Sequence, residues 1–320
     1  MNRPFELFLN FVRSRVYPRL RKQENSYPNV IMDATIVKSM MINLLDSKQP
    51  CMIARYGAFE VLTAENYINI KTAPHSYWKY ITGEIGAWWW QKPIINLLKM
   101  NAGFYPITED CLCKYSQLMY SDSADLDLLA VSQATNKTTL MQDDCPRVGI
   151  GLIEPDYFAN DASSEWTSCL KGKKVLVVHP FAETIKNQYK QRTKLFPDPG
   201  FLPEFELLTV KAVQSIGGDN PDFPTWFDAL QFMEDEMDKL DYDIAVIGCG
   251  AYGFNLAAHA KRTGHKAIHL GGATQILFGI RGKRWENRED YRKLMNEYWV
   301  RPSESDKPKM ASSVEGGCYW

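Results

Sequence analysis

The 320-residue chain lacks both a charge imbalance and a long apolar run. Its 37 lysines and arginines meet 38 acids, for a net charge of −1 at pH 7, which argues against nucleic-acid binding through bulk positive charge. No stretch reaches the roughly 20 consecutive apolar residues of a membrane span. The N-terminus also lacks the continuous apolar core of a signal peptide. With 45% apolar residues, the chain can bury a sizeable core, and we expect no nucleic-acid partner.

Cysteine is present, but in no pattern that binds zinc or forms a disulfide framework. The seven cysteines are an odd and scattered set. Cys111 and Cys113 are one residue too close for a CxxC pair, and no second Cys or His pair lies at zinc spacing. We therefore expect reduced thiols and a cytoplasmic protein.

Residues 1–24 predict a basic amphipathic helix. Its apolar residues recur at helical spacing: Phe5, Phe8, Leu9, Val12, Val16 and Leu20. Six cations up to Lys22 outnumber the single acid, Glu6. Such a helix can lie on an anionic membrane, which makes residues 1–22 a candidate peripheral contact at the inner face of the plasma membrane, or it can dock on the protein's own core. The periodicity is the same for both interpretations, and both remain open.

The rest of the chain alternates apolar runs of strand length with helical patterns. We expect strands at Cys51–Arg55, Asp125–Val131, Gly149–Ile153, Lys174–Val178, Phe205–Val210, Ile244–Ile247 and Lys266–Leu270. We expect helices at Thr35–Leu45, Phe59–Tyr67, Ala182–Lys194 and from Thr225 onward, where Asp228 completes a helix-start pattern. This alternation predicts an α/β, Rossmann-like fold with a mostly parallel sheet flanked by helices and ligands at the carboxyl ends of its strands.

The expected organisation has three parts. The N-terminal helix, 1–24, precedes an α/β unit, 30–300, whose first half is 30–170 and whose nucleotide-binding half is 171–300. A flexible tail, 301–320, follows. Because the tail ends in Tyr319 and Trp320, we expect its end to fold back over another part of the protein.

A glycine turn after the strand at 244–247 is the most informative local pattern. Gly248, Gly250 and Gly253 form GxGxxG, which lets the backbone approach a phosphate at a helix N-terminus. A dinucleotide dehydrogenase carries an acid about 20 residues later to hold the ribose. Here the chain reads His269 and Leu270, with no acid. An NAD(P)-dependent oxidoreductase thus stays an alternative that rests on the glycines alone.

A second glycine turn and a basic cluster follow. Gly271 and Gly272 end the next strand, and three cations lie shortly after them. Cations beside exposed backbone suit a diphosphate, and the other interpretation is a solvated basic loop. The candidate nucleotide-binding residues of this half are Gly248, Gly250, Gly253, Gly271, Gly272, Gln275, Arg281, Lys283 and Arg284.

Two segments resemble the GT-D-type glycosyltransferases of bacterial surface-polysaccharide and glycoprotein assembly. One is IARYGAFE, from Ile53 to Glu60, and the other comprises VLVVHPFAETI and HLGGATQILFGIRGKRW. The resemblance covers most of residues 35–300. It implies a Rossmann-like fold and transfer of a sugar from a nucleoside-diphosphate sugar to a glycan or lipid-linked acceptor.

The resemblance matches Arg55, Gly57 and Glu60 to the family's arginine, glycine and glutamate. It departs at Ala58, where the family has the Asp of an Asp-x-Glu pair tied to metal and donor binding. A single carboxylate is a poor site for Mg²⁺ or Mn²⁺. Metal dependence, with Glu60 as the candidate ligand, is therefore open. Ala58 also motivates an alternative, a catalytically silent partner that binds nucleotide-sugar in a glycan assembly complex.

Fixed cations and helix N-termini can stabilise a departing nucleoside diphosphate in place of a metal. Glu60 can then act as general base, as a sugar ligand, or as the ion-pair partner of Arg55. His179, after a buried-looking strand, is either a hydrogen-bond donor to phosphate or sugar or a satisfied core residue. The aromatic run Trp88–Trp90 is either packing or a stacking platform.

Overall fold

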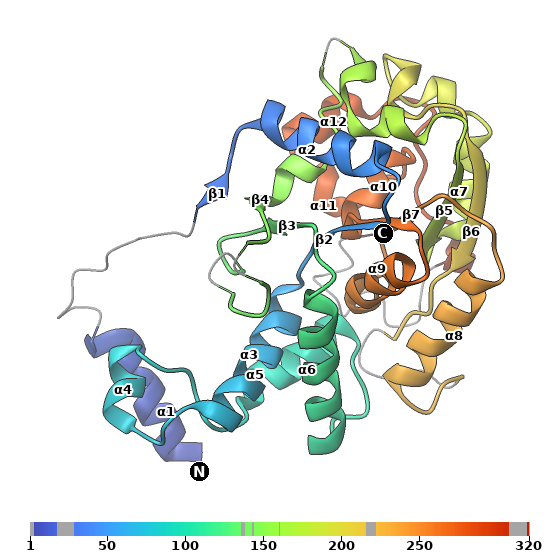
Figure 1. Cartoon of the computed structure of the whole chain (residues 1–320). Helices are drawn as coiled ribbons and strands as arrows, with labels where there is room; N and C mark the ends of the chain where they lie inside the picture. Colours follow the sequence, from blue (N-terminus) through green and yellow to red (C-terminus); the bar gives the residue numbers. More distant parts are fainter. Residues whose placement is uncertain are drawn as a thin grey trace.

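The computed structural model describes residues 3–17, 29–135, 138–142, 144–159, 161–215, 222–306 and 319. Eight strands form one sheet in the order β1-β4-β3-β2-β8-β7-β5-β6, and every pairing between them is parallel (Figure 1). The strands are β1 (Val30–Ile31), β2 (Cys51–Arg55), β3 (Leu128–Val131), β4 (Arg147–Gly149), β5 (Lys174–His179), β6 (Glu206–Lys211), β7 (Ile244–Ile247) and β8 (Lys266–His269). The predicted α/β class with a parallel, helix-flanked sheet is confirmed.

Helices cover both faces of this sheet (Figure 1). They are α1 (Arg3–Phe11), α2 (Ala34–Asp46), α3 (Ala58–Thr72), α4 (Tyr77–Thr82), α5 (Lys92–Ala102), α6 (Glu109–Ser123), α7 (Ala182–Tyr189), α8 (Trp226–Asp238), α9 (Gly253–Arg262), α10 (Thr274–Leu277), α11 (Lys283–Glu286) and α12 (Glu289–Leu294). The predicted start of α8 is confirmed, because Thr225 and Asp228 form a capping box there.

Side chains of each central strand alternate between two hydrophobic cores. In β5, Val175 and Val177 pack into one core, and Leu176 and Val178 pack into the other. Strands buried on both faces read as continuous apolar runs, which is why the sequence located β2, β5 and β7 so closely. The first four strands and the last four meet side by side at the β2–β8 pair. The two halves of the chain thus share one sheet.

Two element predictions were wrong at their ends. The expected strand at Gly149–Ile153 stops at Gly149, and the chain continues as a 3-10 turn, Ile150–Ile153. Ile153 is buried from that turn, so the apolar run reflected burial and not extended backbone. The helix expected to reach Lys194 ends at Tyr189, and a separate 3-10 turn follows at Arg192–Lys194.

The predicted flexible tail begins too early. Asp306 is buried and accepts a hydrogen bond from Thr184 Oγ1 at 2.8 Å, and the Lys211 ammonium lies 3.3 Å from it. The Ser303 N–H also donates to Thr184 Oγ1, at 3.2 Å. Residues 301–306 therefore belong to the folded unit, since Arg301, Ser303 and Asp306 each contact a specific partner in it. Of the rest of the tail, only Tyr319 lies within the described residues.

Helix α1, a π-helical turn (Val12–Val16) and α4 form a small lobe beside the sheet domain (Figure 1). Leu9 is buried with Tyr80 and Ala87, and the Tyr80 hydroxyl donates to Asn10 Oδ1. The helix predicted at 1–24 is thus helical over its described part, and residues 18–24 lie outside the described residues. No helix in the described ranges is long and apolar enough to cross a bilayer.

Candidate functional site

A cavity of about 450 Å³ lies at the carboxyl ends of four adjacent strands. It opens where β2, β8, β7 and β5 end, so both halves of the chain contribute to it. Parallel α/β sheets place their ligands at this edge, because loops and helix N-termini converge there. Arg55, His269 and His179 each stand at the last position of a strand and line this cavity.

The turn after β2 places a carboxylate beside an arginine. Gly57 is the N-cap of α3, and Glu60 reaches back over it, so that a Cβ on Gly57 would overlap the Glu60 carboxylate. Burial raises the pKa of Glu60, while the backbone amides of Glu60 and Phe59 and the charge of Arg55 act in the opposite direction. Glu60 is therefore a carboxyl group held in the cavity wall with an increased affinity for a proton.

The turn after β7 presents backbone without any covering side chain. A short 3-10 turn, η8 (Gly250–Tyr252), leads into α9, and no side chain caps either element. Gly250 has a φ of +59°, which favours glycine. A Cβ on Gly248 would lie 2.6 Å from the Gly271 carbonyl oxygen, so only glycine fits between the two turns. The cavity here is lined by residues 248–252, which offer polar backbone to a ligand.

The third glycine of the GxGxxG pattern has a different role. A Cβ on Gly253 would collide with the imidazole of His269, so this glycine lets α9 pack against the end of β8. His269 in turn interacts through Nδ1 with the Arg55 carbonyl oxygen at 3.1 Å. Gly253 does not line the cavity. Its observed role is in packing, and its predicted contact with the nucleotide stays a prediction.

Gly271 and Gly272 complete the wall opposite the β7 turn. Gly271 has a φ of +61°, and the position of its missing side chain lies 3.5 Å from Cδ of Arg55. Arg55, from the first half of the sheet, therefore lies at van der Waals distance from this turn of the second half, and the positive φ is what favours glycine here. At Gly272 a Cβ would lie 2.9 Å from the Tyr319 ring.

Three arginines bring positive charge to the cavity. They are Arg55, Arg284 and Arg288. Burial lowers the pKa of Arg55, and nearby Tyr319, Glu154 and Glu60 oppose that change. Since an arginine side chain keeps its charge in proteins, this wall stays cationic.

Two members of the predicted basic cluster do not line this cavity. Lys283 is exposed at the start of α11. Arg281 holds the backbone together: its Nη2 donates to the Asn296 carbonyl at 3.1 Å, and its N–H donates to the Val300 carbonyl at 2.7 Å. Sequence spacing could not separate these roles, because α11 turns successive side chains to different sides.

His179 lies in the cavity wall as a neutral ring. It is 4% exposed, and its Nδ1 accepts a hydrogen bond from the Phe181 N–H at 3.0 Å. Burial lowers the pKa of His179 to about 3, although the charge of Asp306 acts against this. With Nδ1 accepting, Nε2 carries the proton of the neutral ring. His179 is thus both a satisfied strand-end residue and a wall residue with an N–H donor.

The end of the chain also reaches this wall. The Tyr319 hydroxyl accepts a hydrogen bond from Arg284 Nη1 at 3.0 Å, and the Tyr319 carbonyl accepts one from Gln275 Nε2 at the same distance. Its ring lies 5.8 Å from that of Trp285. The expectation that the aromatic C-terminus folds back holds for Tyr319, and Trp320 lies outside the described residues.

The sequence missed several residues that line this cavity. Glu154, which accepts a hydrogen bond from the Tyr291 hydroxyl, and Arg288 come from irregular segments with no recognisable motif. His269 could have been found, since it is the last residue of a strand that was predicted.

The described residues do not provide a set of metal ligands. No group of three or more His, Cys, Asp or Glu side chains within the described ranges could hold an ion. The cavity offers the carboxylates of Glu60 and Glu154, and backbone amides already interact with that of Glu60. Since Mg²⁺ and Mn²⁺ require several oxygen ligands, this arrangement does not fit a protein-bound ion, and no chemical step is assigned to one.

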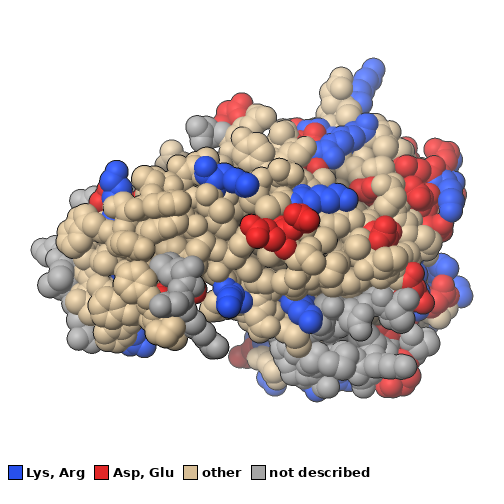
Figure 2. Space-filling view, turned by 90° about the horizontal axis from the view of Figure 1, so that it is seen from below, with Lys and Arg blue, Asp and Glu red and all other residues tan. Residues whose placement is uncertain are grey.

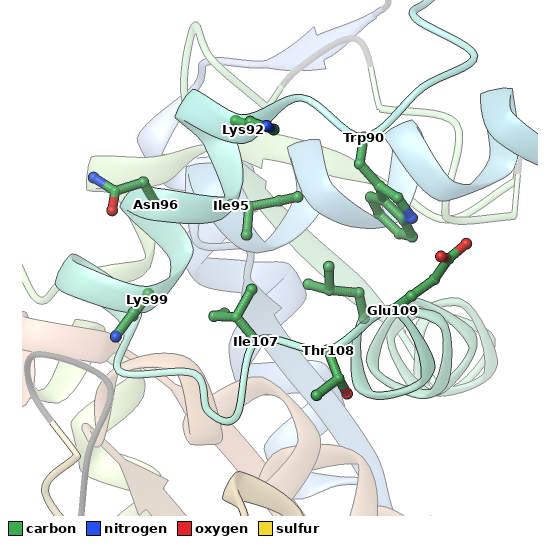
Figure 3. Close-up of a pocket in the computed structure, with 9 residues that line it drawn as sticks. Trp90, Lys92, Ile95, Asn96, Lys99, Ile107, Thr108 and Glu109 are labelled. Atoms are coloured by element: carbon green, nitrogen blue, oxygen red, sulfur yellow. The ribbon is translucent and has the colours of Figure 1, made fainter. Parts of the chain in front are cut away.

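A second, more open cavity of about 510 Å³ lies between α5 and the start of α6. Figure 3 shows Trp90 and Glu109 at one end of it, Lys99 and Asn96 at the other, and Ile95 and Ile107 between them. Trp90 is therefore a cavity residue. Trp88 and Trp89 instead pack on Tyr80 in the lobe, with ring centroids 6.2 and 4.8 Å away.

No protein-family model matches this chain, and no curated protein matches it. Among solved structures, a similar chain is the highly conserved domain of unknown function 1792, described as having a distinct glycosyltransferase fold. The likeness covers 82% of this chain and 98% of that chain, with 12% identity and a TM-score of 0.37. Its description names a glycosyltransferase fold.

Proposed function

We propose that this chain is a glycosyltransferase that moves a sugar from a nucleoside-diphosphate sugar to a hydroxyl of a glycan or lipid-linked acceptor, in surface-polysaccharide or glycoprotein assembly. One observation carries the proposal. Uncapped glycine turns, three arginines and a carboxyl group of raised pKa converge on one cavity at the carboxyl edge of a parallel sheet. Its volume, about 450 Å³, is in the range of small-molecule sites.

The diphosphate is assigned to the β7 turn and the arginines. Backbone N–H groups at Gly250 and Ala251 can point at phosphate oxygens, because no side chain caps this helix start. Arg284 and Arg288 also line the cavity, where guanidinium groups can contact phosphate through two hydrogen bonds, and Arg288 is at the same time ion-paired with Asp290. Negative charge grows on the diphosphate as the sugar departs, and fixed cations stabilise that charge most when it is fully formed.

Glu60 is assigned as the base for the acceptor. In the proposed step, the acceptor hydroxyl oxygen forms a bond to the anomeric carbon while its proton passes to the Glu60 carboxylate. The bond between the anomeric carbon and the diphosphate oxygen breaks, and its electron pair leaves with the nucleoside diphosphate. A carboxylate whose pKa is raised by burial is a stronger base than an exposed one, which suits this task.

The neutral Nε2–H of His179 is assigned to a hydroxyl of the donor sugar. A buried imidazole that stays neutral can donate a hydrogen bond without competing with the arginines for charge. His269 serves a supporting role, since its ring packs between Arg55 and Gly253.

A catalytically silent nucleotide-sugar-binding partner is the second candidate. The observation in its favour is that Glu60 is a lone carboxylate at the turn, with Ala58 two residues before it in place of a second acid, and that backbone amides and Arg55 oppose the rise in its pKa caused by burial. In that case the cavity binds the donor but does not turn it over. An NAD(P)-dependent oxidoreductase has less support, because His269 occupies the strand end where a ribose-binding acid would stand.

A thermal-shift screen tests the proposal. The protein would be heated with UDP, GDP, CDP and dTDP, with their sugars, and with NAD⁺, each in the presence of Mn²⁺ or EDTA. A ligand at 100 times its Kd adds about 2.7 kcal/mol of apparent stability, which is easily seen. A nucleotide-sugar response that survives EDTA is expected. A response that requires Mn²⁺ would show that the bound diphosphate completes a metal site, and a response to NAD⁺ alone would overturn the proposal.

Turnover separates the two candidate functions. Release of nucleoside diphosphate in the presence of a lipid-linked acceptor supports the transferase, and its loss in Glu60→Gln supports the assigned base. Tight donor binding with no release across a broad acceptor panel would support the silent partner instead.

A further inference from the structure

One side of helix α1 packs on the lobe, and the opposite side is left uncovered. Glu6 and Leu9 are 8% and 2% exposed and face the lobe. Asn10 accepts from the Tyr80 hydroxyl, and Arg13 Nη1 donates to the Ile85 carbonyl at 2.9 Å. These residues recur every three or four positions, as one face of a helix does. The docking interpretation of this helix is therefore correct for this face.

The opposite side carries large apolar residues in solvent. Leu7, Phe8 and Phe11 are 59%, 58% and 57% exposed. Phe5 is 38% exposed and packs edge-on against Tyr77 of α4, with ring centroids 5.2 Å apart. At about 100° per residue, the four α1 side chains cover an arc of about 160°. We call this set, Phe5, Leu7, Phe8, Phe11 and Tyr77, the outer face.

The exposed charge on α1 and on the turn that continues it is positive. Glu6 is the single acid between residues 3 and 17, and it is turned inward and buried. Arg15, in the turn that continues α1, is exposed. Figure 2 looks onto this lobe at the left, where uncharged atoms predominate. An apolar helix face next to exposed positive charge, with no exposed acid on the described helix, is complementary to an anionic apolar boundary.

We propose that the outer face binds the surface of an anionic membrane. Helix α1 lies in the plane of the interface, with Leu7, Phe8 and Phe11 entering the boundary of the acyl chains and Arg15 among the headgroups. A second copy of the chain is a poorer occupant, because a two-fold contact would bring the same positive residues together.

The lobe is coupled to the cavity by one helix. Asn66 of α3 donates to the carbonyls of Ala87 and Trp89 at 2.8 and 3.0 Å and accepts from the Gln91 N–H at 3.0 Å. Helix α3 begins beside the cavity, with Glu60 in its first turn, and its 15 residues extend about 22 Å. A bound lobe would thus hold the cavity close to the membrane. The proposal itself does not rest on glycosyl transfer.

Co-sedimentation of the full-length chain with vesicles tests this proposal. Vesicles of equal parts phosphatidylglycerol and phosphatidylcholine are expected to bind the protein. The variant Leu7→Ser/Phe8→Ser/Phe11→Ser should bind at least about 30-fold more weakly, because it removes the inserted apolar surface. It keeps Leu9, Asn10 and Arg13, and an unchanged Tm and circular dichroism spectrum would show that the fold is intact. Phe158→Ser, at a residue 56% exposed outside the lobe, is the matched control and should bind like the wild type.

The positive charge of Arg15 provides a second, independent test of vesicle binding. Arg15→Gln should weaken binding to the anionic vesicles about fivefold and leave binding to pure phosphatidylcholine unchanged. No binding of the wild-type chain to anionic vesicles would overturn the proposal. So would binding that survives the triple substitution, or a dimer in solution that the triple substitution abolishes while vesicle binding is absent, since the occupant would then be a second copy.

Discussion

The turns after β2 and β7 face the same cavity, yet the helix N-termini that follow them differ in whether a side chain interacts with their backbone N–H groups. At the β2 turn, Glu60 folds back over Gly57 and interacts with the first backbone amides of α3. At the β7 turn, no side chain caps η8 or α9, and Gly248 and Gly250 leave the backbone open. A helix start that already holds a carboxylate has no vacancy for a phosphate. This difference supports the proposal that the anionic ligand binds at the β7 turn and that proton transfer takes place at the β2 turn.

The largest effect is expected from acidification, which should lower the stability of the folded protein through His269, a residue that contacts both turns. Burial lowers the pKa of His269 from 6.5 to about 3. Between these values the unfolded chain binds a proton that the folded chain does not, so unfolding becomes easier as the pH falls. The contribution of His269 is complete above about pH 6.5 and decreases by about 1.4 kcal/mol per pH unit below it, or about 3 kcal/mol by pH 4.

Urea unfolding between pH 7 and pH 4 measures this contribution. His269→Asn keeps an amide where Nδ1 donates to the Arg55 carbonyl and removes the titrating ring. Its stability should therefore fall less steeply with decreasing pH than that of the wild type. His75→Asn, which removes an exposed histidine ring outside the cavity, is the matched control. An equal slope in His269→Asn and the wild type would refute the prediction.

Glu60→Gln tests the assignment of proton transfer to the β2 turn. Turnover should fall at least about 100-fold, because an amide cannot accept the acceptor's proton, while donor affinity should change less than about threefold. In the wild type, burial raises the pKa of Glu60, so activity should rise with pH as this carboxyl group ionises, and the variant should lose that rise. Glu183→Gln, at an exposed acid in the first turn of α7, is the matched control. A parallel loss of donor affinity would instead place the donor at the β2 turn.

Gly248→Ala should destabilise the protein by about 2 kcal/mol, since its Cβ would press against the Gly271 carbonyl oxygen 2.6 Å away. Gly250→Ala should cost about 1 kcal/mol, because its φ is +59° but the space around it is open. Gly151→Ala meets no atom within 4 Å and should be nearly neutral. Urea unfolding ranks the three variants, and a Gly248→Ala protein as stable as Gly151→Ala would show that the β7 turn is not tightly packed against Gly271.

Arg284→Ala should weaken donor binding about tenfold, because it removes a charged hydrogen-bond donor from the cavity wall. Lys283→Ala removes the same charge one residue earlier, at an exposed position outside the cavity. Titration calorimetry with the nucleotide identified by the screen compares the two. Equal losses would mean that the general positive field matters and not the position of Arg284.

Tyr319→Phe should cause the smallest change in donor affinity, and it should increase the affinity where Arg284→Ala decreases it. The Tyr319 hydroxyl accepts a hydrogen bond from Arg284, so its removal makes that guanidinium more available to a diphosphate. Donor binding should tighten about two- to fivefold. The double variant Arg284→Ala/Tyr319→Phe should show no such gain, and a gain in that background would assign the effect to another contact.

The local pattern of apolar residues was enough to predict the bounds of strands that are buried on both faces of the sheet. The continuous apolar runs at Cys51–Arg55 and Ile244–Ile247 matched the strands at both ends. The same signal was misleading at Ile150–Ile153, where the residues are apolar because the turn packs on the core. Apolar composition reports burial, and extended backbone follows from it only where neighbouring strands are present.

Only part of the candidate site could be predicted, namely the residues that a local sequence pattern marks. His179, Gly248 and Gly271 were predicted to meet because a parallel sheet brings strand ends together, whereas Arg55 was singled out by the resemblance at IARYGAFE; all four line the cavity. Gly253 matched the motif but packs on His269, and Arg281 matched a basic cluster but holds backbone carbonyls. Glu154 and Arg288 carry no motif, since their place in the cavity depends on long-range packing.

The sequence by itself determined the parallel α/β class, the order of most elements, and the positions of the glycine turns, because these depend on apolar periodicity and on the conformational freedom of glycine within a few residues. The tertiary structure alone decided that β2 lies next to β8, and so that Arg55 passes Gly271 and Glu60 shares a cavity with Arg284. It also decided that Asp306 is buried and that only one face of α1 is covered. Each of these contacts joins residues far apart in the chain, and which of them meet is settled by the packing of the whole core.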